Sequence, residues 1–167
     1  MPCRNSHSSP PLGDITLSEE EGAIVALDWG RGRDRTETPL LRRAASLLHD
    51  YFDGRPVVFD LPLAPHGTPF RQTVWAALRR IPTGETRSYI AIAREIGCRS
   101  ARAIGGANGA NPIPILIPCH RVVAAGGALG GYSGGDGPAT KRYLLDLEHR
   151  SLWHTRMPGP DAKEPFR

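Results

Sequence analysis

Alternating apolar and polar positions predict three strands in the first part of the chain. Residues 15–17 alternate in this way, residues 23–29 are mostly apolar, and the turn-forming residues 19–22 lie between them, which is typical of a β-hairpin. Residues 57–63 carry apolar side chains at every second position, in a segment bounded by two prolines. This alternation predicts a third strand.

Apolar side chains three and four positions apart predict helices. They occur over residues 40–51, 70–81, 89–96 and 143–147, and the segment 101–107 predicts one more short helix. A hydroxyl residue stands where it can cap the first turn of four of these helices. The four capping residues are Thr38, Thr68, Ser88 and Ser100.

These elements predict an α+β fold with two domains. Residues 1–66 would form a small N-terminal α/β domain with an antiparallel sheet and one helix, and residues 67–150 a mainly helical domain. Residues 151–167 contain three prolines and match nothing in the core pattern, so we expect a flexible tail.

The composition is that of a globular protein, with 40% hydrophobic and 23% charged residues in a chain of 167. No apolar run is long enough to span a membrane, and the first 14 residues hold no apolar stretch that could be a signal peptide. Three cysteines are too few for a disulfide framework and lack metal-ligand spacing. We therefore expect a cytoplasmic protein with no membrane contact.

Residues 89–107 have the helix, short turn, helix pattern of a helix-turn-helix motif. The second helix, over residues 101–107, consists almost wholly of small residues and carries one charge, Arg102. Small side chains allow close approach either to the protein core or to a groove of DNA. The residues alone leave both alternatives open.

Charge is distributed unevenly along the chain. Residues 71–121 contain 8 Arg and 2 Glu, a net charge of +6, whereas residues 1–70 contain 7 Arg and 10 Asp and Glu, a net charge of −3. The basic segment is either an ordinary solvated surface or, together with a DNA-binding motif, a face that contacts phosphates.

A cysteine and a histidine follow a proline-rich segment. Three prolines within residues 112–118 exclude a helix and disfavour a central strand, so we expect a stiff, extended element that places Cys119 and His120. Ten of the nineteen glycines lie within residues 105–137, which lets the backbone there approach a ligand closely. Cys119 is either an inert buried side chain or a nucleophile that His120 activates by accepting its proton.

Adjacent side chains on an extended backbone point to opposite sides, so this proton transfer needs a kink or a bridging water. His120 also needs a carboxylate that fixes its tautomer and stabilises its charged form. The best-placed candidate is Glu148, on the helix that begins at Pro138.

Several motifs follow one another in a fixed order over residues 68–148. They are Phe70-Arg71-Gln72-Thr73-Val74-Trp75, Ile81-Pro82-Thr83-Gly84-Glu85-Thr86, Ser88-Tyr89, Ala101-Arg102-Ala103-Ile104-Gly105-Gly106-Ala107, Asn111-Pro112, Pro118-Cys119-His120-Arg121-Val122 and Gly130-Gly131-Tyr132-Ser133-Gly134-Gly135. Together they closely resemble the O6-alkylguanine-DNA alkyltransferase family, the methylated-DNA–protein-cysteine methyltransferases. The resemblance implies a ribonuclease H-like N-terminal domain and a winged-helix-like helix-turn-helix in the second domain.

The implied activity is DNA repair by direct reversal. The protein would flip an O6-alkylated guanine out of the duplex and transfer the alkyl group irreversibly to its own cysteine. By this resemblance Cys119 is the alkyl acceptor, His120 its water-mediated base, and Glu148 the carboxylate behind the histidine. Asn111 would hold the turn between the recognition helix and the active-site segment.

The resemblance also implies contacts with DNA and with the flipped base. Arg102 would fill the stack in place of the base, and Tyr89 would push the target phosphate and donate toward the base. Tyr89 as a core aromatic and Arg102 as a surface cation are the alternatives. The other residues expected at the guanine edge or the DNA groove are Val122, Tyr132, Ser133, Ala103 and Ala107.

The implied partner is double-stranded DNA containing O6-alkylguanine, bound in the minor groove through the helix-turn-helix. We expect a monomer that can cluster on DNA, with no cofactor and no metal. Some members bind zinc, but Cys3, His7 and His66 do not reproduce that ligand set. Asn108 stands where some members have a larger apolar pocket residue, so the accepted alkyl size stays open. O4-alkylthymine is a possible second substrate.

Two functions of other classes compete with this one. A lesion-sensing protein that recruits repair factors conflicts with a cysteine at the acceptor position. A Cys-His hydrolase or acyltransferase lacks an evident oxyanion loop and does not explain the basic helical pair.

Overall fold

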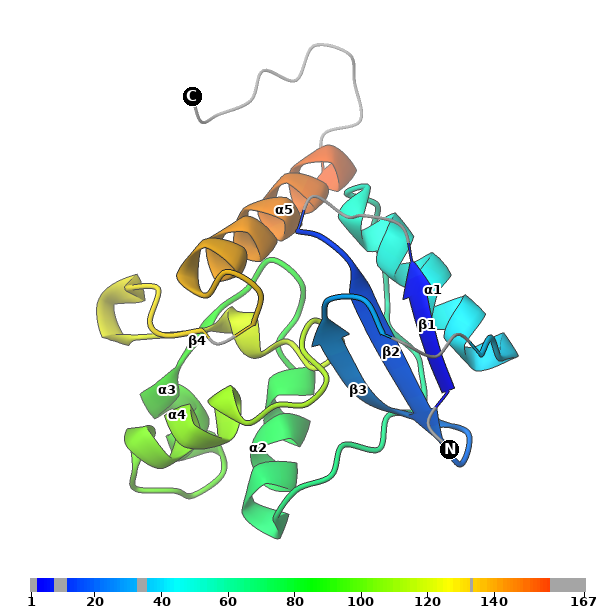
Figure 1. Cartoon of the computed structure of the whole chain (residues 1–167). Helices are drawn as coiled ribbons and strands as arrows, with labels where there is room; N and C mark the ends of the chain where they lie inside the picture. Colours follow the sequence, from blue (N-terminus) through cyan, green and yellow to red (C-terminus); the bar gives the residue numbers. More distant parts are fainter. Residues whose placement is uncertain (1–2, 8–11, 33–35, 133, 157–167) are drawn as a thin grey trace.

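The computed structural model describes residues 3–7, 12–32, 36–132 and 134–156 (Figure 1). Its first half contains a three-stranded antiparallel sheet in the order β1-β2-β3, formed by β1 (Cys3–His7), β2 (Ile15–Glu20) and β3 (Ala23–Trp29). The hairpin of β2 and β3 confirms the predicted pair. The sequence does not predict β1, because an edge strand of polar residues pairs through its backbone and has no apolar alternation.

Helix α1 (Pro39–Phe52) lies beside β1 and β2 (Figure 1). The side-chain oxygen of Thr38 accepts a hydrogen bond from the backbone N–H of Leu41 at 3.1 Å, so the expected cap is present. One face of the helix is buried against the sheet. It carries Leu41, Ala44, Ala45, Leu48 and Tyr51.

The prediction of a strand over residues 57–63 is wrong. The segment forms only an isolated bridge, between Leu63 and Ile24 of β3. Its side chains still alternate, with Leu61 buried and Val58 82% exposed, because the extended chain lies with one side on the core. Alternation reports burial on one side, and not the pairing of a strand with a partner. Three prolines in and around the segment lack the N–H that a ladder requires.

The second half is mainly helical. It contains α2 (Pro69–Arg79), α3 (Tyr89–Glu95) and α4 (Ala101–Gly109), and α3, a short turn and α4 form the predicted helix-turn-helix. The hydroxyls that cap these helices accept backbone N–H groups of the first turns, as expected for Thr68, Ser88 and Ser100.

Short elements connect the helix-turn-helix to the last helix. Strand β4 (Arg87–Ser88) pairs in parallel with β5 (Val122–Val123), and two-residue strands have no periodicity by which a sequence could predict them. The 3-10 turns η1 (Cys119–Arg121) and η2 (Ala125–Gly127) precede α5 (Pro138–Arg156). Helix α5 thus continues into the segment for which we expected a tail, and residues 157–167 lie outside the described part.

A continuous core joins the two halves. Leu17, Ile24 and Leu41 from the first half belong to the same buried cluster as Trp75 and Ile117 from the second. The backbone also connects them, since the N–H of Leu27 in β3 donates to the carbonyl of Pro112 at 2.9 Å. The division of the chain after residue 66 therefore stays a prediction. In the residues that the structure covers, no helix is long and apolar enough to cross a membrane.

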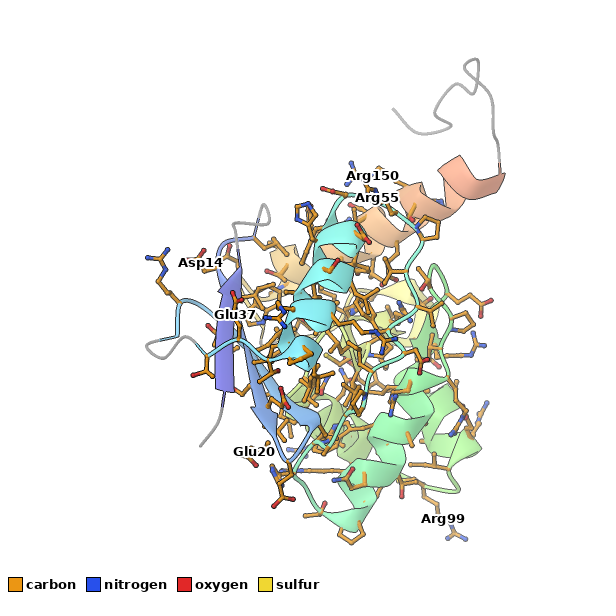
Figure 2. All side chains as sticks on the ribbon, turned by 90° about the vertical axis from the view of Figure 1, so that its right-hand side faces the viewer. Asp14, Glu20, Glu37, Arg55, Arg99 and Arg150 are labelled. Atoms are coloured by element: carbon orange, nitrogen blue, oxygen red, sulfur yellow. The ribbon has the colours of Figure 1, made fainter. Side chains whose placement is uncertain are left out.

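The two halves differ in the charge that they expose. Figure 2 shows Asp14, Glu20 and Glu37 around the sheet and the start of α1, whereas Arg99 projects from the far end of the helical half. Of the 8 arginines in residues 71–121, Arg121 is buried and the other seven are exposed. The positive charge that the sequence places in this segment therefore lies on the surface of the helical half.

Candidate functional site

The segment before the cysteine is a compact loop and not the extended element that we expected. Asn111 closes it from within: its side-chain N–H donates to the carbonyl of Ile117 at 2.8 Å, and its side-chain oxygen accepts from the N–H of Ile113 at 3.0 Å. The backbone turns at Ile115, where φ is 73°. The prolines exclude regular structure, as predicted, but the hydrogen bonds of Asn111 fold the loop back on itself. This places Asn111 in the turn-holding position expected for it.

The loop delivers Cys119 and His120 into the interior. Both lie in η1, whose 3-10 turn supplies the expected kink between their side chains. Cys119 is 4% exposed and His120 is completely buried. Burial raises the pKa of the Cys119 thiol, and the Asn111 amide and the positive charge of Lys141 oppose this rise.

Glu148 lies directly behind the histidine. Its Oε1 is 2.6 Å from Nε2 of His120, and both side chains are inaccessible to solvent. Burial would raise the pKa of Glu148, but its hydrogen bond and charge interaction with His120, together with those of Arg121, lower it to about 2. Since an ionised carboxylate only accepts, Nε2 of His120 is the protonated nitrogen.

The other ring nitrogen of His120, Nδ1, is a free acceptor: it is buried and has no hydrogen-bond partner among the described residues. Burial lowers the pKa of His120, and Glu148 opposes this effect. The histidine is therefore neutral near pH 7, with its Nε2 proton held by Glu148 and its Nδ1 ready to take a proton.

A pocket of about 610 Å³ opens onto the cysteine, within the range of small-molecule sites. Four of the residues expected to contact the base or shape the site line it, namely Cys119, Tyr89, Asn111 and Tyr132. Asn108 also lines it, and its side-chain N–H donates to the carbonyl of Cys119 at 3.2 Å. Ser133 lies outside the described residues.

The carbonyl of Val122 has a partner that we did not expect. Lys141, whose side chain is fully buried, donates from Nζ to this oxygen at 2.5 Å, and the same ammonium lies 5.9 Å from the centre of the Tyr89 ring. Burial lowers the pKa of Lys141, and the nearby Cys119 raises it. The ammonium thus places a positive charge beside the cysteine, and the Val122 oxygen is engaged within the protein.

Helix α4 presents one face to the core and the other to solvent. Ile104, Ala107 and Asn108 are buried, and the carbonyl of Ala107 accepts the indole N–H of Trp75 at 2.9 Å. The expectation that Ala107 contacts DNA is therefore wrong, because the helical repeat turns it inward with Ile104. Arg102 is exposed on the other face and Ala103 is half-buried.

Two of the exposed arginines of the helical half have acidic partners. Arg80 pairs with Glu95 at 2.5 Å and Arg87 with Glu85 at 3.1 Å. Within the described residues the structure gives Arg102 and its neighbours Arg94 and Arg99 no acidic partner. Unpaired cations on a helix-turn-helix favour contact with phosphates.

Comparison with known proteins identifies the family. The model of the 6-O-methylguanine DNA methyltransferase DNA-binding domain matches residues 69–150, and the model of the ribonuclease-like domain of the same family matches residues 7–65. The chain belongs to the O6-methylguanine-DNA methyltransferase family. The α+β fold expected from the resemblance, with a ribonuclease-like part and a helical DNA-binding part, is confirmed.

Individual members of the family match most of the chain. The methylated-DNA–protein-cysteine methyltransferase of Mycobacterium tuberculosis is 54% identical over 149 residues, which cover 83% of this chain and 87% of that protein. The constitutive enzyme of that name from Bacillus subtilis is 43% identical over 153 residues, 84% of this chain and 92% of its own. A crystal structure of Mycobacterium tuberculosis OGT in complex with DNA superposes with a TM-score of 0.79, at 42% identity, over 89% of this chain and 93% of that one.

In this member of the O6-methylguanine-DNA methyltransferase family, the site also contains residues that the sequence did not predict. Arg121 donates to both oxygens of Glu148 and to the carbonyl of Ile81 at 2.7 Å. Its place directly after Cys119-His120 is the sequence signal for this contact. Residues 27–29 of β3 line the pocket, and Tyr51 reaches Glu148 from α1. No local pattern indicates these contacts, because the sheet and the cysteine are far apart in the sequence.

Proposed function

We propose that the protein repairs alkylated DNA by taking the alkyl group from O6-alkylguanine onto Cys119, once per molecule. The observation that carries this proposal is the buried, hydrogen-bonded pair of His120 and Glu148 directly after Cys119, which lines a pocket bordered by the helix-turn-helix. The family relatives named as methylated-DNA–protein-cysteine methyltransferases support the same activity.

The reaction is a displacement at the alkyl carbon. Cys119 Sγ forms a bond to this carbon while the bond from carbon to O6 breaks, and guanine leaves with the electron pair. The Tyr89 phenol gives the leaving guanine a proton, and the proton that the thiol releases to His120 restores the phenol, so that the protons balance overall. The thiol proton passes through a bridging water to His120, whose Nδ1 is the unpartnered acceptor among the described residues. The thioether that forms has no hydrolysable bond, so each molecule reacts once.

Two charged groups act on the proton transfer, Glu148 on the histidine and Lys141 on the cysteine. The Glu148 carboxylate stabilises the imidazolium that forms when His120 accepts the proton. The Lys141 ammonium opposes the effect of burial on Cys119, since a nearby positive charge favours a thiolate. Tyr89 and Tyr132 line the same pocket and offer phenol groups to the flipped base.

We propose that the exposed face of α4 enters the minor groove of double-stranded DNA. Small side chains on this face permit close approach of the backbone, and the exposed arginines of residues 71–121 neutralise phosphates. Arg102 fills the stack when the damaged base is flipped into the pocket, and Tyr89 faces the flipped nucleotide. Since few long side chains reach base edges, binding is nearly independent of sequence and decreases with salt.

Replacing Arg102 with alanine is expected to slow repair of duplex DNA by about 10- to 100-fold, because flipping costs a few kcal/mol that Arg102 offsets. Reaction with the free base O6-benzylguanine needs no flipping and should change less than about twofold. Rates of thioether formation on the two substrates measure the difference. Equal losses on both would make Arg102 a pocket or folding residue.

Two substitutions in α4 separate its faces. Ala107→Leu places a larger side chain in the core and is expected to lower the free energy of unfolding by about 1–3 kcal/mol. Gly106→Leu faces open space, so the fold should keep its stability while duplex DNA binds more weakly. Urea denaturation and DNA titration test the pair. Unchanged DNA affinity in Gly106→Leu would contradict the groove-facing assignment.

The proposed function is tested by following the lesion. Duplex DNA with one O6-methylguanine, incubated with the protein, should lose the lesion in proportion to the protein added, up to one lesion per molecule. A protein that only senses damage and recruits other factors would bind this DNA and leave the lesion intact. A multiple-turnover loss would also contradict the proposal. The same assay with O4-methylthymine establishes whether that base is a second substrate.

Three wider expectations belong to this proposal. A monomer suffices because one chain builds the complete pocket, although several molecules can cluster on one DNA. Action on DNA favours a cytoplasmic location. The helical unit, residues 67–150, would hold the reacting groups and residues 1–66 would support them.

A further inference from the structure

The catalytic carboxylate is also contacted from the N-terminal half of the molecule. Tyr51, in the last turn of α1, donates its hydroxyl to Oε1 of Glu148 at 2.9 Å, across 97 residues of sequence. The same oxygen lies 2.6 Å from Nε2 of His120. Tyr51 is 5% exposed and Glu148 is 1% exposed. The tyrosine and the histidine therefore share one oxygen atom in a place that water does not screen.

The N-terminal half holds the Tyr51 ring in place. The ring makes an edge contact with Phe52 at 5.3 Å between centroids and a tilted contact with Phe59 at 5.6 Å. Helix α1, which carries it, is fixed against the sheet. The position of the hydroxyl is thus set independently of the loop that carries Cys119.

Tyr51 remains a neutral donor. Burial and the charge of Glu148 both raise its pKa, so the phenol keeps its proton throughout the range in which the histidine titrates. The other charged groups near this oxygen come from two elements. Arg121 of η1 contacts both carboxylate oxygens, and Lys141 of α5 acts on His120 through its charge.

We propose that Tyr51 is a positioning residue for alkyl transfer: its hydroxyl holds Oε1 of Glu148 toward His120 and withdraws part of the charge that this oxygen offers to the imidazole. The inference rests on the proposed function. It gives the N-terminal half a part in the chemistry, because a side chain of α1 changes the basicity of a histidine that lies in the other half.

The direction of the effect follows from the shared oxygen. A carboxylate that loses one donor holds an imidazolium more strongly, so removal of the Tyr51 hydroxyl raises the pKa of His120. Because His120 must be neutral to accept the thiol proton, the acidic limb of the pH–rate profile then moves to higher pH.

Tyr51→Phe tests this with the ring contacts retained. The rate of thioether formation with O6-benzylguanine is measured against pH, and the acidic limb is expected to move up by about half a pH unit or more. Tyr143→Phe, a half-buried tyrosine of α5 outside the site, is the matched control and should keep the wild-type limb. A lower rate with an unshifted limb would make Tyr51 a packing residue and overturn the proposal, as would an unchanged profile.

Two further measurements complete the test: the first does not use the phenylalanine variant, and the second does not rely on activity. With 3-fluorotyrosine placed at position 51, the more acidic phenol donates more strongly and the acidic limb should move to lower pH. In a Cys119→Ser background, titration of His120 by NMR should give a higher pKa when Tyr51 is replaced by Phe. Absence of both shifts overturns the proposal. If the wild-type protein forms no thioether, the proposed function fails, whereas transfer by the wild type with no shift in these variants refutes only the role of Tyr51.

Discussion

Replacing Cys119 with serine is expected to reduce alkyl transfer below detection while duplex DNA binding stays close to that of the wild type. A serine hydroxyl is not ionised near neutral pH and is a harder, poorer nucleophile toward an alkyl carbon than a thiolate. The side chain is buried and of nearly the same size, so the fold should tolerate the change. Thioether formation with O6-benzylguanine and titration with methylated duplex DNA measure the two properties.

Cys98→Ser is the matched control for this experiment. Cys98 lies in the turn between α3 and α4, where its thiol lies 3.6 Å from the carbonyl of Ser100, and it does not line the pocket. Reaction with the free base requires no helix-turn-helix contact, so this variant should react at the wild-type rate. Alkyl transfer that is retained in Cys119→Ser, or lost in Cys98→Ser, would show that Cys119 is not the nucleophile.

Replacing Arg121 with methionine is expected to lower the free energy of unfolding by about 3–5 kcal/mol, because it leaves the buried Glu148 carboxylate without its permanent positive partner. The lost contacts include the hydrogen bonds to Ile81 and Thr83. Arg79→Met, at an exposed position on α2, is the control and should change stability by less than about 0.5 kcal/mol. Urea denaturation at pH 7 measures the free energy of unfolding of both variants. A similarly small decrease in the two would show that the buried network contributes little to stability.

The same network predicts how stability depends on pH. The pKa of Glu148 is lowered to about 2, so its ionised form stabilises the fold above the unfolded value near 4.5, and this contribution is lost as the pH falls from 4.5 toward 2. The pKa of buried His120 is also lowered, so stability begins to decrease below its unfolded value of 6.5. Both effects act in the same direction on acidification. In Arg121→Met the pKa of Glu148 rises toward its unfolded value, so thermal unfolding between pH 3 and 7 should show a smaller loss of stability on acidification below pH 4.5 than in the wild type.

Much of the fold follows from local patterns. The hairpin of β2 and β3 is confirmed by its apolar strands and the turn between them, and α1 and the helix-turn-helix are confirmed because each helix has a capping hydroxyl. The kink at Cys119 and the place of Glu148 behind His120 also agree with the expectations. Residues close in sequence or on one helix face can be related to each other without a structure.

Contacts between distant segments could not be predicted in this way. Tyr51 has the spacing of an ordinary core residue of α1, and nothing near it in sequence indicates that its hydroxyl reaches Glu148. The strand expected over residues 57–63 fails because one-sided burial produces the same alternation as strand pairing. Ala107 fails for the converse reason: in a helix made of small residues, composition does not distinguish the buried face from the exposed face.

The central claim is that Cys119 itself receives the alkyl group. Its most direct test is the intact mass of the protein after incubation with duplex DNA that contains O6-methylguanine, followed by tryptic mapping. The proposed chemistry predicts a gain of one methyl group per molecule, located on the peptide of residues 103–121, which contains Cys119. An unchanged mass, or a methyl group on the peptide of residues 95–99, which contains Cys98, would contradict it.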